Sequence, residues 1–271
     1  MRLWVVYRML DGLAWLIWRF SSPAMAQLAA FHVIDRWPSR LARIYNFGRK
    51  AHYRADYRVR ALNHILCVFT QYDPNFTLHV DVENADALIA ASMGARGVLI
   101  CTAHLGLTLA AHRALHDLGY TPAFVIFDSP RTARWNWGHP APLTVIDAGR
   151  PDVLVRCSRH IQRGDAIIAF VDYHTAGMAM CDGPQPLGIS PNAFAWAHLN
   201  DIPILFMASR LDSGGRIVIE LENSASVHRD GPATGASTAR AFAEFLEQRT
   251  GWRCIIRRPK EDIGVAERLS R

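Results

Sequence analysis

The sequence predicts one α/β domain in which a mostly parallel, twisted sheet is flanked by helices and preceded by a helical N-terminal segment. Patterns typical of strands and of amphipathic helices alternate along most of the chain, as they do in such sheets. Two of the strand patterns, 97–103 and 165–172, are continuous apolar runs, which are typical of strands buried on both faces. The 271 residues contain no linker-like stretch and no internal repeat, so one large domain fits better than two.

The N-terminal segment, residues 1–38, differs in charge from most of the domain that follows it, residues 39–271. Residues 1–60 hold eleven basic and three acidic side chains, a net charge of +8, whereas the whole chain has a net charge of +6. The rest of the chain is therefore slightly acidic, at −2. This asymmetry predicts a basic face that meets an anionic partner, either nucleic acid or a phospholipid surface.

Aromatic side chains distinguish these two partners. They are interleaved with long aliphatic residues, which is typical of a bilayer interface and disfavours nucleic acid; they are Trp4, Tyr7, Trp15, Trp18, Phe20, Phe31 and Trp37. Arg8, Asp11 and Arg19 interrupt the apolar run too often for a spanning helix. We therefore expect an interfacial helix or hydrophobic hairpin, peripheral or monotopic, on the cytoplasmic face of the inner membrane. The alternative is that these residues pack in the core.

The remaining elements follow from the spacing of apolar residues and from turn and cap residues. Helices are predicted at 39–71, 85–93, 152–162, 191–199 and 238–249, with a further helix that follows Gly106 and ends near residue 118. Strands are predicted at 76–82, 97–103, 122–127, 143–146, 165–172, 203–209 and 216–221, with a hairpin turn at 212–215.

Two titratable residues come at the ends of the buried strands. His104 follows the first strand and precedes a helix, and Asp172 ends the second. Chemistry in parallel sheets gathers at the carboxyl ends of the strands. The positive end of a helix dipole disfavours the imidazolium form, so His104 is suited to act as a neutral general base. The alternative is that this histidine is a structural residue at a strand end.

Three segments occur in order around these residues: GVLICTAHLG (97–106), GDAIIAFVDY (164–173) and PLGISPNAFAWA (186–197). Together they resemble the lipid A biosynthesis (lauroyl/myristoyl) acyltransferase family, within the lysophospholipid acyltransferase-like group. The resemblance covers roughly residues 80–250. In that family a strand leads into His-Phe-Gly-Asn-Trp-Glu, which is similar to the first of these segments.

The resemblance implies transfer of a fatty acyl group from acyl carrier protein or coenzyme A to a hydroxyl or amine acceptor. His104 would deprotonate the acceptor, and in the family a carboxylate five residues later orients the histidine. This chain has Leu109 at that position. Asp172 is the candidate replacement, because neighbouring strand ends can converge; Thr108 and His112 are weaker candidates. Asp172 has an equal alternative, in which it only fixes a loop or binds the acceptor.

The resemblance also implies a site for a phosphate-bearing substrate. Arg131 and Arg134 fall where the family carries an arginine that meets phosphate, and guanidinium groups suit that contact. Together with Thr108 they form the predicted substrate-binding set. The alternative for either arginine is a solvated charge on a loop.

Other motifs are missing from the sequence. His112 and His116 have the spacing of a metal pair but no third ligand follows, so no metal is predicted, and no nucleotide-binding motif indicates a cofactor. The five scattered cysteines disfavour a disulfide framework. The partners expected are an acyl carrier protein or acyl-coenzyme A and a membrane surface. Because Leu109 replaces the acid, the alternative function is a catalytically inactive homologue that binds acyl chains or an acyl carrier protein.

Overall fold

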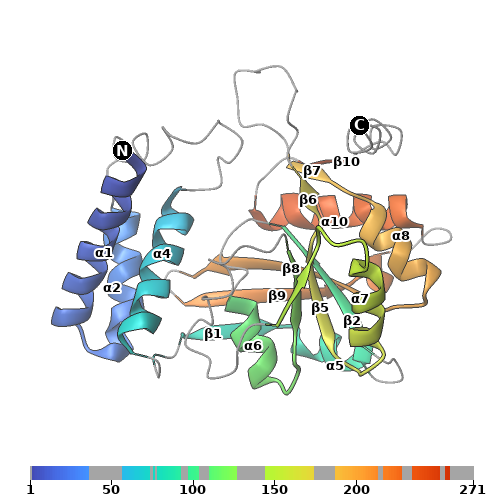
Figure 1. The fold of residues 1–271 in the computed structure, drawn as a ribbon, viewed down its shortest axis with the longest axis horizontal. Coiled ribbons are helices and arrows are strands. Elements are labelled where there is room, and N and C mark those ends of the chain that lie inside the picture. Colours follow the sequence, from blue (N-terminus) through green and yellow to red (C-terminus); the bar gives the residue numbers. More distant parts are fainter. Residues whose placement is uncertain are drawn as a thin grey trace.

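The computed structural model describes most of the chain and has the expected α/β class, with a mostly parallel sheet flanked by helices (Figure 1). The described residues are 2–36, 57–73, 76, 78–92, 97–103, 110–126, 144–173, 187–212, 216–227, 234–250 and 254–256. The helices are α1 (Arg2–Phe20), α2 (Pro23–Asp35), α4 (Tyr57–Tyr72), α5 (Ala85–Ser92), α6 (Ala111–Asp117), α7 (Val153–Ile161), α8 (Asn192–Leu199), α9 (Ser224–Val227) and α10 (Gly235–Thr250).

In the described part of the chain, the main sheet has seven strands, of which five neighbours run parallel. In spatial order the strands are β1 (Val80–Glu83), β9 (Ile217–Asn223), β8 (Ile204–Leu211), β2 (Val98–Thr102), β5 (Ala166–Phe170), β3 (Ala123–Ile126) and β4 (Thr144–Asp147). β8, β2, β5, β3 and β4 are parallel, whereas β9 is antiparallel to β8 and β1 is parallel to β9. The carboxyl ends of the five parallel strands therefore share one edge.

A second sheet of three strands was not predicted. It consists of β10 (Cys254–Ile256), β7 (Leu187–Ile189) and β6 (Asp172–Tyr173). The predicted strand 165–172 is divided by this sheet, because β5 ends at Phe170 and β6 begins at Asp172. The predicted strand 76–82 is also corrected, since β-structure begins only at Val80, where pairing with β9 starts.

Side chains alternate between the two faces of the sheet and form two core clusters. On β2, Val98 and Ile100 pack with α5 and α6 in the first cluster, whereas Leu99 and Cys101 pack with α7, α8 and α10 in the second. Burying one such side chain fully contributes about 1.5–3 kcal/mol. This alternation explains why 97–103 reads as a continuous apolar run.

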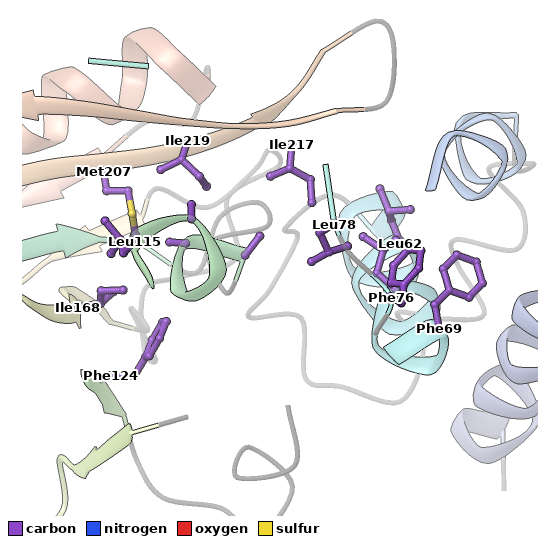
Figure 2. Packing of buried hydrophobic residues seen from close by; sticks show 14 of the residues in the cluster. Leu62, Phe69, Phe76, Leu78, Leu115, Phe124, Ile168, Met207, Ile217 and Ile219 are labelled. Atoms are coloured by element: carbon purple, nitrogen blue, oxygen red, sulfur yellow. The ribbon is translucent and has the colours of Figure 1, made fainter. Parts of the chain in front are cut away.

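The first cluster continues into the N-terminal helices, which pack against one another at the β1 end of the sheet (Figure 1). Figure 2 shows Phe69 and Leu62 of α4 beside Phe76 and Leu78, in the same cluster as Leu115 on α6. The predicted boundary at residue 38 lies outside the described residues. However, α4, which follows that boundary, packs on α1 and α2. Core packing, the alternative considered for the N-terminal segment, therefore holds for its inward side chains.

Buried residues of α1 and α2 occur at helical spacing and face α4. They are Leu10, Ala14, Ile17, Ala26, Ala30 and Ile34. Among the described helices, none is long and apolar enough to cross a membrane.

A buried side-chain amide attaches the helices to the edge strand. Gln27 on α2 donates from Nε2 to the carbonyl oxygen of His79 (3.2 Å), and its Oε1 accepts from the backbone N–H of His79 (2.9 Å). The carbonyl oxygen of His79 also accepts from the backbone N–H of Ile217, which begins β9. One amide thus connects the helical layer to the main-chain ladder of the sheet.

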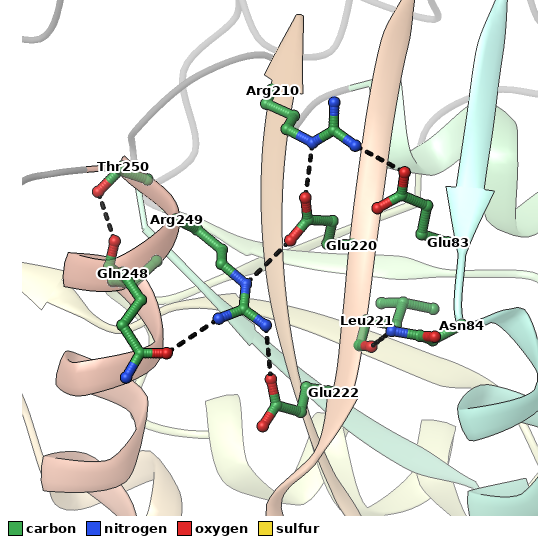
Figure 3. Close-up of polar contacts among 10 residues, drawn as sticks. Glu83, Asn84, Arg210, Glu220, Leu221, Glu222, Gln248, Arg249 and Thr250 are labelled. Atoms are coloured by element: carbon green, nitrogen blue, oxygen red, sulfur yellow. Dashed lines mark hydrogen bonds and ion pairs between the residues drawn. The ribbon is translucent and has the colours of Figure 1, made fainter. Parts of the chain in front are cut away.

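A surface network connects β1, β8, β9 and α10 (Figure 3). Arg210 donates to Glu220 and to Glu83 at 2.6 Å each, and Arg249 donates to Glu220 (3.0 Å) and Glu222 (3.2 Å). Single exposed pairs contribute little, but a shared network holds several elements together. The hydrogen bond to Glu220 raises the pKa of Arg210, so the guanidinium stays charged.

Replacing Gln27 by methionine should weaken the attachment of α2 to the backbone of His79 without leaving a cavity. Methionine has a similar length but neither donates nor accepts these bonds. We expect Gln27→Met to lower the free energy of unfolding by about 1–3 kcal/mol, from two lost hydrogen bonds. Urea unfolding measures this difference. Gln162→Met, at an exposed position that follows α7, is the matched control and should stay within about 0.5 kcal/mol of the native chain; equal stability of the two variants would contradict the attachment.

Candidate functional site

The carboxyl ends of β2 and β5 lie side by side. The two strands are parallel neighbours, with Thr102 opposite Phe170. Beyond the last pair, the backbone N–H of Val171 donates to the carbonyl oxygen of Thr102 at 2.9 Å. The next described residue of the first strand end is Ala103, which is buried. This part of the edge is the candidate site, because His104 is next in sequence after Ala103 and Asp172 is next after Val171.

A buried hydroxyl anchors the end of β2 on its other side. Oγ1 of Thr102 donates to the carbonyl oxygen of Met207 on β8 at 3.0 Å, and the threonine is fully buried. At the opposite end of β2, Gly97 lies against the turn between α7 and β5. A Cβ there would collide with the carbonyl oxygens of Ile161 and Asp165. β2 is thus fixed at both ends.

The chain passes from one sheet to the other at Val171. Its carbonyl oxygen accepts from the backbone N–H of Ser190 at 2.9 Å, immediately after β7. Asp172 then pairs antiparallel with Ile189, and Tyr173 with Gly188. The predicted convergence of neighbouring strand ends therefore holds for the backbones of β2 and β5.

Asp172 lies on β6, which β7 separates from β10 in the small sheet. Directly paired residues share a face, and the register aligns Asp172, Ile189 and Ile256. The charge of Asp172 helps raise the pKa of the Cys254 thiol to about 12, after the larger effects of burial and of Glu247. Oε1 of Glu247 also accepts from the backbone N–H of Cys254. Sequence reasoning missed this neighbourhood, because its residues are far apart in the chain and no local pattern connects them.

The structure leaves five of the sequence-predicted residues untested. His104, Thr108, Leu109, Arg131 and Arg134 all lie outside the described residues. Their assignments as general base, substrate-binding residues and replaced acid stay predictions. Of the predicted catalytic pair, the structure describes Asp172 alone.

His112 belongs to a different environment from Asp172. It is buried on α6, with its ring 6.0 Å from Phe124 and 6.5 Å from His116, centroid to centroid. Phe124 is in the first core cluster, whereas Ile189 beside Asp172 is in the second. His112 and Asp172 therefore lie on opposite sides of the main sheet. In the part of the chain that the structure describes, no group of three or more histidine, cysteine or carboxylate side chains is arranged to hold a metal.

Cys101, Cys157 and Cys254 are unsuited to nucleophilic chemistry at neutral pH. Burial raises the pKa of Cys101 and raises that of Cys157 to about 11, and Cys254 is raised to about 12. The thiolate is the reactive form, and all three thiols stay protonated near pH 7. A covalent acyl-cysteine intermediate at any of these three positions is therefore disfavoured.

Comparison with known proteins gives no assignment, since no protein-family model and no curated protein matches the chain. The candidate site therefore rests on the geometry of the strand ends and on the sequence segments described above.

Asp172→Asn should make Cys254 more reactive. Removing the negative charge lowers the pKa of the thiol, so the thiolate fraction at any pH below that pKa increases. We expect faster alkylation of Cys254 by iodoacetamide at pH 9–10, followed by peptide mass spectrometry, with Cys157 unchanged. Asp201→Asn is the control, because Asp201 is exposed and its positive φ of 51° suits asparagine. An unchanged rate at Cys254 would show that the carboxylate faces elsewhere.

Proposed function

We propose that this protein is an acyltransferase that moves a fatty acyl group from an acyl thioester to a hydroxyl or amine acceptor. The observation that supports it best is the pairing of the β2 and β5 ends at the Val171–Thr102 hydrogen bond. These two strands lead directly into the segments that resemble the lipid A acyltransferases. The donor is acyl carrier protein or acyl-coenzyme A, and no cofactor is required by this chemistry.

His104 is the proposed general base. Its neutral imidazole takes the proton from the acceptor O–H or N–H as the acceptor attacks the thioester carbonyl carbon. The new C–O or C–N bond forms, the C–S bond breaks, and the leaving thiolate takes the proton back from the imidazolium. Arg131, Arg134 and Thr108 are the proposed contacts to the substrate.

The role of Asp172 is a separate question within this proposal. A carboxylate that fixes a catalytic histidine is worth about 10⁴ in rate in the serine proteases. Asp172 starts at the correct strand end for that role, but its charge acts on Cys254 across the small sheet. The antiparallel pairing of Asp172 with Ile189 supports the alternative in which this residue fixes the small sheet. Without a second acid, slow turnover is expected.

The missing motif acid favours a second candidate function. A chain with Leu109 in place of the acid is also suited to bind an acyl chain or carrier protein without catalysis. Turnover measurements distinguish the two functions directly.

An apolar face on α1 and α2 supports location at a lipid surface. Trp15, Leu16 and Phe20 are 51%, 47% and 80% exposed on α1, and Met25 on α2 is 51% exposed. Exposed Arg8 and Arg19 lie on α1 within one turn of exposed apolar residues. Apolar and aromatic groups with flanking cations suit the boundary of an anionic bilayer. We propose that this face, here called the lipid face, lies on the cytoplasmic side of the inner membrane.

Substitution of His104 tests the reaction. Purified protein with acyl-coenzyme A or acylated carrier protein and a mixture of lipid acceptors should release free thiol, which a chromogenic thiol reagent detects. His104→Ala should reduce the release at least about 100-fold, as expected for a general base. His79→Gln is the matched control, because the side chain of His79 is exposed and only its backbone is used.

The outcomes separate the two candidate functions. Thiol release that persists in His104→Ala would show that another residue is the general base. Binding of donor without any release, unchanged in His104→Ala, would favour the inactive homologue. A rate gain in Leu109→Glu would show that the site accepts the missing acid.

Point substitutions on the lipid face test membrane binding better than deletion of α1 would. Leu10, Ala14 and Ile17 of α1 belong to the core, so its deletion would also disturb the fold. Trp15→Ser with Phe20→Ser should weaken binding to vesicles of anionic phospholipid at least about tenfold, from lost apolar contact. Vesicle sedimentation measures this. Leu199→Ser is the control, since Leu199 is 85% exposed on α8, away from the lipid face. Equal binding by both variants would defeat the assignment.

A further inference from the structure

A charged cluster joins α1 to α4 beside the lipid face. Oδ1 of Asp11 on α1 lies 2.8 Å from Nε2 of His64 on α4, and Oδ2 of Asp11 lies 4.0 Å from the guanidinium group of Arg8. We call Arg8, Asp11 and His64 the α1–α4 cluster. Tyr72 of α4 lies close to it, because burial and then the charge of Asp11 raise the pKa of the tyrosine hydroxyl. The proposed reaction uses none of these groups.

The core holds the two helices together at this cluster. α1 and α4 lie side by side (Figure 1), and the ring of Trp18 on α1 is 5.5 Å from that of Phe69 on α4. Leu10, which precedes Asp11, is fully buried. The side chains of Asp11 and His64 are themselves 37% and 25% exposed. Their neighbours therefore fix the pair in place, while solvent can exchange protons with it.

The cluster borders the lipid face along one side of α1. Arg8, Asp11 and Trp15 are spaced i, i+3 and i+7, and residues at this spacing lie on one side of a helix. Trp15 belongs to the lipid face, and Asp11 lies about one turn from it, about 6 Å along the helix axis. This distance is shorter than the Debye length, which is about 10 Å at 0.1 M salt. The charges of the cluster therefore act on the surface that Trp15 contacts.

Protonation of His64 changes the net charge of the cluster. With a neutral imidazole, the positive charge of Arg8 and the negative charge of Asp11 cancel. With a protonated imidazole, two cations and one carboxylate give the cluster a net charge of +1. Histidine is the side chain whose charge ordinarily changes between about pH 5 and 8. A fall in pH therefore adds one positive charge beside Trp15, and a rise in pH removes it.

Other charged or titratable groups surround the cluster in this helical layer. Those with described side chains are Arg19 on α1, His32 on α2, Tyr72 on α4, and Arg36 and Asp73 just beyond the ends of α2 and α4. The arginines keep their charge over this range of pH, and the raised pKa of Tyr72 keeps its hydroxyl neutral. His32 is exposed, and it is therefore the alternative source of pH dependence among the described side chains of these helices.

From these observations we infer that the α1–α4 cluster makes membrane binding pH-dependent, with tighter binding to an anionic phospholipid bilayer at acidic pH. The inference rests on the proposed lipid face and specifies its regulation, and it does not depend on acyl transfer. One positive charge close to an anionic bilayer strengthens binding about fivefold. The switch requires no change of conformation, because His64 already lies beside the surface that its charge affects.

Vesicle sedimentation at two pH values tests the inference. The probe is a vesicle of phosphatidylglycerol and phosphatidylcholine, because the phosphodiester of phosphatidylglycerol stays charged at both pH 5.5 and pH 7.5. The native chain should bind about fivefold more tightly at pH 5.5. His64→Gln keeps a donor for Asp11 but stays neutral, so it should bind equally at both pH values. His32→Gln is the matched control and should keep the native difference.

Asp11→Asn should strengthen binding at neutral pH. Without the carboxylate the cluster has a net charge of +1 even when His64 is neutral, so this variant should bind about fivefold more tightly than the native chain at pH 7.5. Asparagine has nearly the same size as aspartate, and circular dichroism compares the folds. Asp201→Asn, which removes an exposed carboxylate beyond α8, is the control and should bind like the native chain.

The outcomes separate the pH switch from the proposals on which it rests. Equal binding of the native chain at both pH values would overturn the switch and retain the lipid face. A pH dependence that persists in His64→Gln, or that disappears in His32→Gln, would also overturn the switch. No binding at either pH would overturn the switch and the lipid face together. Native pH dependence in His104→Ala, with no thiol release by the native chain, would retain the switch and overturn acyl transfer.

Discussion

The backbone of Val171 donates a hydrogen bond to the carbonyl of Thr102 on β2 and accepts one from Ser190 beyond β7. These two bonds fix the point at which the chain leaves the main sheet and enters the small one. On its other side, β2 is held to β8 by the hydrogen bond from Thr102 to Met207. The ends of β2, β5 and β7 are therefore fixed relative to one another and to the middle of β8. The candidate site, the position of Asp172 and the start of the small sheet all depend on this junction.

Most strands of the main sheet could be predicted because each is a local pattern. Residues 97–103 and 165–172 read as buried strands since both faces of the sheet are covered, by α5 and α6 on one side and by α7, α8 and α10 on the other. The small sheet could not be predicted in this way. β10 pairs with β7 across more than sixty intervening residues, and its three residues form no pattern of their own. The division of 165–172 at Val171 follows from that non-local pairing.

The same distinction applies to the candidate site. Parallel topology places the two strand ends at one edge of the sheet, so His104 and Asp172 could be selected from sequence as a pair. That β2 and β5 are direct neighbours could not be predicted, because β3 and β4 lie between them in the chain. The effect of the Asp172 charge on the pKa of Cys254 could not, because it depends on the non-local pairing of β10 with β7. On α1 and α2 the sequence indicated an interfacial segment or core packing as alternatives. The helices have both kinds of side chain, with Leu10 and Ile17 in the core and Trp15 and Phe20 exposed.

The proposed acyl transfer requires the imidazole of His104 to meet the acyl donor at the edge formed by β2 and β5. Nuclear magnetic resonance of ¹⁵N-labelled histidines, during titration with a stable acyl thioether analogue of the donor, measures this contact directly. We expect the His104 resonances to shift with saturating behaviour while those of His79 do not. A saturating titration that shifts other histidines and leaves His104 unchanged would contradict it.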